Sequence, residues 1–160
     1  MFIATGAIGG KFADLEFQQA EATQLAAAST YTFSNANIGT ARADRLVLAC
    51  ITSFVNVANR TITGVTIGGN AATLITTIYN EPPLKTQIST IAYLLVPSGT
   101  TATIAATFSN NMNVCFCRVY TMIRYASSTP FDTLSATAAN AAFVSGTIDI
   151  PKIGALLVNS

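Results

Sequence analysis

The stretch Thr61–Tyr79 reads TITGVTIGGNAATLITTIY and decides the fold class. Apolar residues alternate with threonines on both sides of a central Gly68-Gly69-Asn70 break. Side chains of a strand point to opposite faces with period two, so each arm has one face suited to a core. The glycines and the asparagine supply the positive φ values that a tight turn between strands needs. The stretch therefore predicts two strands joined by a hairpin turn.

Similar strand and turn signals recur from Thr30 to Val158. Arg45–Ile51 is apolar on both faces, which is typical of a central strand covered from two sides. Thr101–Phe108 alternates apolar residues with threonine and alanine. This pattern predicts a half-buried strand whose threonine face is exposed to solvent. We also expect strands at Ile88–Val96, Asn113–Tyr125, Val144–Ile150 and Ile153–Val158, a turn at Asn110-Asn111, and a surface loop at Ser127–Ala142. These patterns predict an all-β fold, an antiparallel sandwich (Ig-like or jelly-roll-like) of about eight strands.

The N-terminal segment differs in texture from the rest. Asp14–Ser29, DLEFQQAEATQLAAAS, is the only stretch with substantial helix-former content, and Asp14 is a suitable cap. Its apolar stripe is narrow, so a short helix and an extended arm that orders on a neighbouring molecule are both compatible with it. We therefore divide the chain into an N-terminal arm, residues 1–29, and a β-sandwich domain, residues 30–160.

Composition limits the classes of function. The chain has 160 residues, enough for one domain, and only 9% are charged against about a quarter in an average soluble protein. Mean hydropathy is +0.49, yet no apolar run approaches the roughly 18 residues of a membrane-spanning helix. The net charge of +1 favours neither nucleic acid nor an anionic membrane. No signal-peptide pattern is present at the N-terminus, which predicts an unprocessed chain made in a cytoplasm. The ending at Asn159-Ser160 without a turn is compatible with a longer natural chain.

Catalytic and metal-binding patterns are weak. The chain has no histidine, and its seven carboxylates are scattered without a pair that stands out. Cys50, Cys115 and Cys117 are an odd set without zinc-ligand spacing, which predicts free, mostly buried thiols. Gly68-Gly69 lacks the lysine and the following helix of a phosphate loop. We therefore expect no enzyme activity, no cofactor and no structural metal.

The strand expected at Asn113–Tyr125 carries two contrasting faces. Cys115, Cys117, Val119, Thr121 and Ile123 form a plausible inner face, whereas Phe116, Arg118, Tyr120, Met122 and Arg124 form the other. The second set combines large apolar groups with arginine, which are enriched at protein–protein contacts. Both contact with a partner and coverage by the chain's own N-terminal arm explain it. With the apolar residues of the arm, the predicted contact set is Phe2, Ile3, Ile8, Phe12, Leu15, Phe17, Phe116, Arg118, Tyr120, Met122 and Arg124.

Three segments together carry a family resemblance: TFSNANIGTARADRLVLACI (Thr32–Ile51), ITGVTIGGNAATLI (Ile62–Ile75) and LVPSGTTATIAATFSNNMNVCFCRVYTM (Leu95–Met122). PFDT at Pro130–Thr133 fits the same pattern. With them the chain resembles a β-sandwich domain of virion structural proteins of tailed bacteriophages. The resemblance covers about half of the chain.

The resemblance implies a structural protein of the virion, without catalytic residues or cofactor. A short chain of low charge with a possible N-terminal arm suits a capsid decoration or cement protein, which forms homo-oligomers and contacts other virion proteins, either the major capsid protein or tail proteins. A tail or fibre component is a second interpretation. A carbohydrate-binding or adhesin-type module is a third, although the chain has no tryptophan and only Tyr79, Tyr93, Tyr120 and Tyr125 as substitutes. If the arm is the anchor, a chain that lacks residues 1–29 is expected to fold without joining the particle.

Overall fold

Every regular element of the structure is a β-strand. The computed structural model describes residues 2–5, 14–81, 83–125, 127, 136–139 and 156–159. Its strands are β1 Phe2–Thr5, β2 Asp14–Gln24, β3 Ala28–Asn37, β4 Leu46–Val55, β5 Ile62–Ile67, β6 Asn70–Ala71, β7 Thr73–Glu81, β8 Lys85–Leu95, β9 Thr101–Met112, β10 Val114–Ile123, β11 Ala136–Ala139 and β12 Leu156–Asn159. Because no helix is found in the described ranges, they contain no helix that could cross a membrane.

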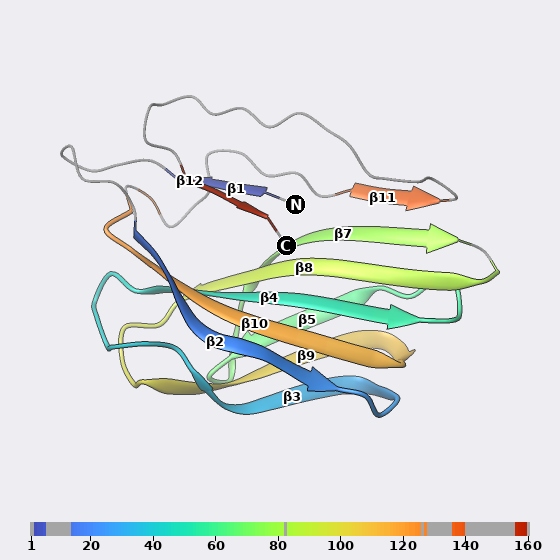
Figure 1. The fold of residues 1–160 in the computed structure, drawn as a ribbon, viewed down its shortest axis with the longest axis horizontal. Coiled ribbons are helices and arrows are strands. Elements are labelled where there is room, and N and C mark those ends of the chain that lie inside the picture. The colour runs from blue at the N-terminus through green and yellow to red at the C-terminus, as the bar shows by residue number, and fades with distance from the viewer. Residues whose placement is uncertain are drawn as a thin grey trace.

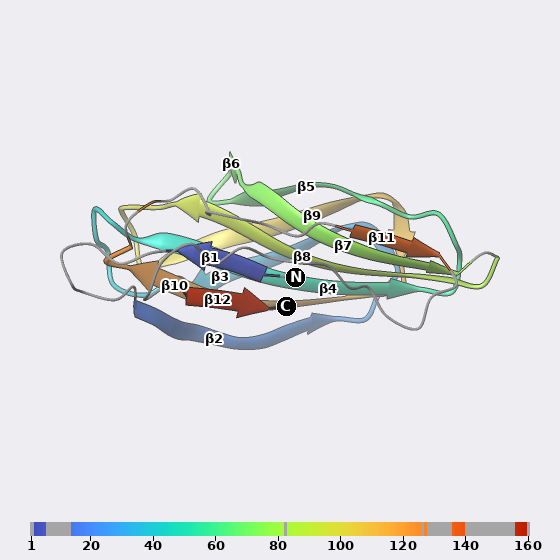
Figure 2. The same cartoon turned by 90° about the horizontal axis from the view of Figure 1, so that it is seen from above.

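Two large sheets form the sandwich. One has six strands in the order β11-β7-β8-β4-β10-β2, and the other has four in the order β3-β9-β5-β6. Their pairs are antiparallel except β11 with β7, which is parallel. The strands run along the long axis of the molecule (Figure 1), and β5 and β2 lie on opposite sides of it (Figure 2). A separate two-stranded pair joins β1 to β12. The predicted antiparallel sandwich is confirmed.

The main core lies between the two sheets. Tyr31 and Ile104 reach it from the four-stranded sheet, and Val47, Ile51 and Cys117 reach it from the six-stranded sheet; all are at most 1% exposed. The Tyr31 hydroxyl donates to the Met112 carbonyl at 2.6 Å, so the one polar atom of that ring is satisfied inside the core. The alternation in the sequence is therefore realised as one apolar face on each sheet.

The Gly68-Gly69 turn forms as predicted, but the hairpin after it is short. Gly68 and Gly69 have φ of 59° and 81°, the left-handed values of a primed turn. β6 pairs with β5 only through Thr66↔Ala71 and Ile67↔Asn70. At Ala72 the chain then crosses to the six-stranded sheet, where β7 pairs with β8. The second arm predicted from the alternation is thus divided between the two sheets, because its apolar face must meet the core from the other side.

Asp14–Gln24 is a strand, and the helix interpretation of this segment is wrong. β2 pairs with β10 through Leu15↔Met122, Phe17↔Tyr120 and Ala22↔Cys117, with bulges on either side of Val119. An unpaired β10 would expose a row of backbone donors and acceptors, and satisfying them outweighs a helix propensity of a few tenths of a kcal/mol per residue. β2 is therefore part of the six-stranded sheet, and a chain without residues 1–29 would lack one of its strands.

Side-chain amides join β2 to β3 and close this side of the sandwich. Gln24 donates from Nε2 to the Thr32 carbonyl, and Gln19 Oε1 accepts the Asn37 backbone N–H at 2.6 Å. Asn37 Nδ2 donates to the Gln18 carbonyl at 3.0 Å. These bonds satisfy backbone groups at the edge of β3 without another strand. The glutamines that raise the helix propensity of the segment therefore serve as links between the two sheets.

The corner between β9 and β10 lies further along the chain than predicted. Asn110-Asn111 remains within β9, so the turn expected there is wrong, and the chain changes sheet at Asn113. The Asn113 N–H donates to the Phe54 carbonyl at 2.9 Å, which fixes the corner to β4. Of the C-terminal predictions, β11 is a strand inside the expected loop 127–142, β12 overlaps the strand expected at 153–158, and the strand expected at 144–150 lies outside the described residues.

Arg45 holds two connections between the sheets. Its side chain is 1% exposed and its guanidinium donates to four backbone carbonyls. The acceptors are Gly39 (2.6 Å), Val96 (2.9 Å), Ser98 (2.7 Å) and Gly99 (2.9 Å). Gly39 lies between β3 and β4, and the other three lie between β8 and β9. A buried cation that donates to backbone carbonyls therefore fixes two loops that each pass from one sheet to the other.

Candidate interaction surface

The outer face of the six-stranded sheet carries large side chains in rows across the strands. Tyr120 of β10 stands opposite Leu48 of β4, which stands opposite Tyr93 of β8. The row beside it runs from Arg118 through Cys50 to Ile91. Alternation directs these side chains away from the main core, whose cluster contains their strand neighbours Ala49, Ile51 and Val119 instead.

Part of this outer face is a second buried cluster. Leu46, Leu48, Ile75, Ile91 and Met122 are each at most 3% exposed, and Leu15, Cys50, Tyr93, Tyr120 and Tyr125 pack against them. The prediction that Arg45–Ile51 forms a strand covered on two sides is confirmed, because β4 lies inside the sheet with buried residues on both faces.

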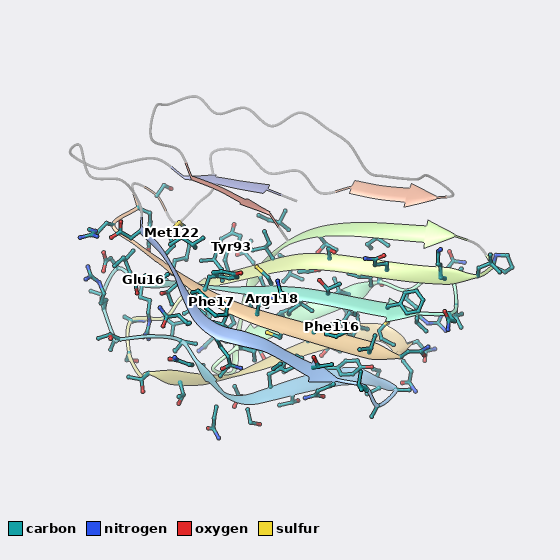
Figure 3. The ribbon with its side chains drawn as sticks, in the orientation of Figure 1. Glu16, Phe17, Tyr93, Phe116, Arg118 and Met122 are labelled. Atoms are coloured by element: carbon teal, nitrogen blue, oxygen red, sulfur yellow. The ribbon has the colours of Figure 1, made fainter. Side chains whose placement is uncertain are left out.

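The fold brings both parts of the predicted contact set together. Phe17 of β2 lies against Tyr120 of β10, with ring centroids 5.4 Å apart and planes inclined by 59°. Phe17 is 58% exposed, a high value for an aromatic ring. Figure 3 shows Phe17, Tyr93 and Arg118 near one another on the sheet and Phe116 further along β10. We call Phe17, Tyr93, Phe116, Arg118 and Tyr120 the β2–β10 surface; Phe17 and Arg118 are exposed in it and the other three are half-buried.

Other residues of the predicted contact set lie elsewhere. Leu15 is half-buried beside the second cluster, and Met122 is fully buried within it, so that side chain is closed to a partner in this structure. Phe2 and Ile3 lie in β1, a strand whose side chains are not described. Ile8 and Phe12 lie outside the described residues.

Arg124 leaves the face that strict alternation assigns to it. β10 ends at Ile123, and Arg124 has a φ of 57°, in the left-handed region. No sequence pattern predicts this conformation. Its guanidinium pairs with Asp14 at the start of β2, and its backbone N–H donates to Asp44 Oδ2 at 3.1 Å. Arg124 therefore ties β2 and the loop before β4 to the end of β10.

Asp44 collects charge-assisted contacts at this corner. Arg42 donates to its two carboxylate oxygens at 3.0 and 3.3 Å, and the Arg124 N–H donates to one of them. The Arg42 hydrogen bond, followed by the Arg124 N–H, lowers the pKa of Asp44 below its ordinary value. The charged form of Asp44 is thus the one that holds the loop.

The cysteines are free thiols, as predicted. Cys115 and Cys117 are buried and Cys50 is half-buried. Burial raises the pKa of Cys50 to about 11 and those of Cys115 and Cys117 to about 12, so all three are protonated near neutral pH and are poor nucleophiles. Within the described part of the chain, no three Cys, Asp or Glu residues gather in a group that could hold a metal ion.

Comparisons of the chain with protein-family models, with curated protein sequences and with solved structures find no match. The function is therefore argued from the chemistry of the β2–β10 surface and from the resemblance noted in the sequence.

Proposed function

We propose that the protein is a structural component of a bacteriophage virion, a decoration or cement protein that binds other virion proteins and its own copies through the β2–β10 surface. The observation that carries the proposal is the exposed Phe17 ring, held against Tyr120 on the same sheet face as Arg118. The resemblance to virion β-sandwich domains supports the same class.

The chemistry of the surface suits a protein partner. Aromatic side chains and arginine dominate the binding energy of many protein–protein contacts. Aromatic rings bury large areas and lose few rotamers, and arginine adds a planar guanidinium with several hydrogen-bond donors. Here they stand on paired strands, so their backbone is ordered before a partner arrives. Binding then needs little further loss of conformational entropy.

The low charge of the chain also supports an assembly. Only 9% of its residues are charged, and a surface with so few charges resists association weakly. A protein that touches several neighbours at once leaves a particle only when all contacts break together, so modest individual contacts suffice. A position on the tail or on a fibre would use the same surface and belongs to the same class.

Virions produced from the genome that encodes this chain provide the test. We expect quantitative mass spectrometry of purified particles to find the protein in a fixed ratio to the major capsid protein. Phe17→Ser should lower that ratio at least about tenfold, equivalent to the roughly 1.4 kcal/mol that loss of one well-packed aromatic contact removes. Thr103→Ser, an exposed position on the four-stranded sheet, is the matched control and should leave the ratio unchanged.

Equal melting temperatures of the two variants would show that both are folded. Absence of the protein from purified particles would reject the virion assignment. Full occupancy of the particle by the Phe17→Ser variant would be compatible with a virion protein, but it would reject the β2–β10 surface as the site that attaches it.

A further inference from the structure

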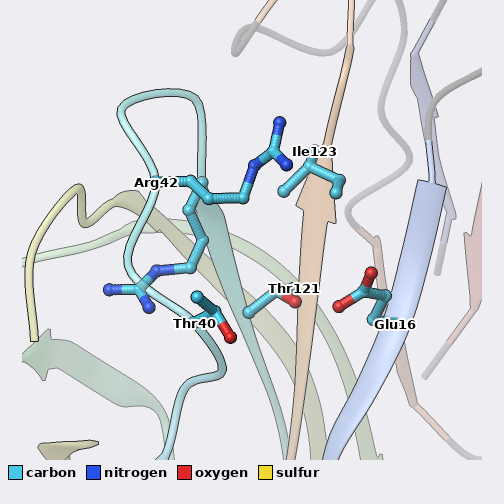
Figure 4. Close-up of a pocket in the computed structure, with 6 residues that line it drawn as sticks. Glu16, Thr40, Arg42, Thr121 and Ile123 are labelled. Atoms are coloured by element: carbon cyan, nitrogen blue, oxygen red, sulfur yellow. The ribbon is translucent and has the colours of Figure 1, made fainter. Parts of the chain in front are cut away.

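A pocket of about 310 Å³ opens where the loop between β3 and β4 meets β2 and β10. Its lining consists of Glu16, Thr40, Arg42, Arg45, Thr121 and Ile123. Figure 4 shows Thr40 and Arg42 on one side of Thr121, and Glu16 on the other side. Glu16 and Phe17 are adjacent on β2 and point to opposite faces, so the pocket is separate from the β2–β10 surface.

One wall of the pocket is held by Gln18. Its amide Nε2 donates to Thr121 Oγ1 at 2.9 Å and to Glu16 Oε2 at 3.1 Å, so both groups are oriented by one side chain. Gly39 has a φ of 75°, and a Cβ at this position would lie 2.7 Å from Gln18 Cδ. Both observations favour glycine where the loop approaches this amide. Thr121 is 2% exposed and keeps its own O–H as a donor.

The opposite wall is equally fixed, because both of its arginines have hydrogen-bond partners. Arg45 anchors the loop through its four carbonyl bonds, and Arg42 is paired with Asp44. Asp44 raises the pKa of Arg42, and Glu16 adds to this effect across the pocket. The lining contains Arg42, Arg45 and Glu16, and Asp44 beside Arg42 brings the formal charge of these four side chains to zero. A ligand of one sign would be repelled by one wall.

We propose that this pocket binds one neutral saccharide unit. Glu16 offers acceptor oxygens for sugar hydroxyls, the Thr40 and Thr121 hydroxyls and Arg42 offer donors, and Ile123 offers an apolar wall for the C–H side of a ring. A neutral polyhydroxylated ligand is the class that uses donors and acceptors together without a net charge. The volume lies at the lower end of the range for small-molecule sites, which suits one sugar ring. The inference is independent of the virion assignment.

The test is a titration of the isotope-labelled full chain with methyl glycosides of glucose, galactose, mannose, rhamnose and N-acetylglucosamine, followed by NMR. We expect at least one of them to shift the amide resonances of Gly39, Thr40 and Thr121 in a saturable way. Thr40→Val and Glu16→Gln should each weaken that binding about tenfold. The first leaves a sugar hydroxyl unpaired, and the second replaces a charged acceptor by a weaker neutral one. Thr103→Val matches the first variant and Phe17→Ser removes the neighbouring aromatic; both should leave the affinity unchanged.

Three results would overturn the proposal. The first is no saturable shift at these residues with any of the five glycosides. The second is unchanged affinity in both pocket variants, with the shifts centred on Tyr93 and Tyr120, which would move sugar binding to the aromatic face. The third is tighter binding of inorganic phosphate, an anion, or of glycine, a zwitterion, at the same residues.

Discussion

The outer faces of the two sheets follow the same alternation but differ in chemistry. β3, β5, β6 and β9 contain no Lys, Arg, Asp or Glu, and their outward positions are mainly exposed hydroxyl residues, among them Thr30, Thr32, Thr103 and Thr107. The outer face of the six-stranded sheet carries leucine, isoleucine, tyrosine and arginine, and part of it is fully buried.

This difference separates a face of exposed hydroxyls from the face on which we propose contacts with a partner. Threonine fits a strand through its branched Cβ, and its hydroxyl can be satisfied locally, as in the Thr63 Oγ1 donation to the Thr107 carbonyl at 3.1 Å. Such a face is complete without a partner. The Phe17 ring on the other sheet stays 58% exposed although it lies against Tyr120, and burial in a partner would remove the remaining apolar area from water. The asymmetry therefore supports the proposal that a partner would bind the six-stranded sheet.

Replacing Arg45 should have the largest effect, because Arg45 connects loops that pass between the two sheets. Arg45→Met would leave four buried or partly buried carbonyls without a donor, and we expect the free energy of unfolding to fall by about 4 kcal/mol. Arg42→Met, which removes an exposed arginine of the same loop, should leave it nearly unchanged because solvent screens the Arg42–Asp44 pair. Urea unfolding of both variants is the measurement. Equal losses of unfolding free energy would show that the carbonyl bonds of Arg45 do not stabilise the connection between the sheets.

Leu48→Ala tests whether the outer face of the six-stranded sheet contains a true second core. Leu48 has no exposed surface, so truncation should lower the free energy of unfolding by about 3 kcal/mol through lost burial and a residual cavity. Thr103→Ala, on the outer face of the other sheet, should change it by about 0.5 kcal/mol or less. If Leu48→Ala lowered the free energy of unfolding as little as Thr103→Ala, the outer face of the six-stranded sheet would contain no second core.

The smallest effect concerns Asp44 and pH. Because its folded-state pKa is lowered, Asp44 stabilises the fold above the unfolded carboxyl pKa of about 3.9, and this contribution is lost as pH falls through the lower folded value. Asp44→Asn should therefore destabilise slightly at about pH 7 and not at about pH 2. Unfolding measured at both pH values in low and high salt is the check. Solvent screening keeps the expected effect small. If Asp44→Asn lowered the free energy of unfolding equally at both pH values, the charge of Asp44 would not be the cause.

Local patterns in the sequence were sufficient for several features. Period-two alternation assigned the inner face of Thr101–Phe108 and of the strand that contains Cys115 and Cys117, because side-chain direction in a strand follows from the backbone alone. Gly68-Gly69 predicted its turn for a similarly local reason, since few residues adopt positive φ at low cost. The apolar run Arg45–Ile51 predicted a strand with two buried faces, although not the carbonyl contacts of Arg45.

The tertiary structure decided what depends on distant partners. Asp14–Gln24 has residues that suit a helix, yet it is a strand because the edge of β10, about a hundred residues away, needs a partner. The pocket has no sequence signature, since Glu16, Thr40 and Thr121 meet only when β2, a loop and β10 are assembled. Composition and alternation thus determined the fold class and the faces of the strands, which are properties of neighbouring residues. Strand pairing, the corners between sheets and the meeting of polar groups were decided by long-range hydrogen bonding and burial, which a local pattern does not record.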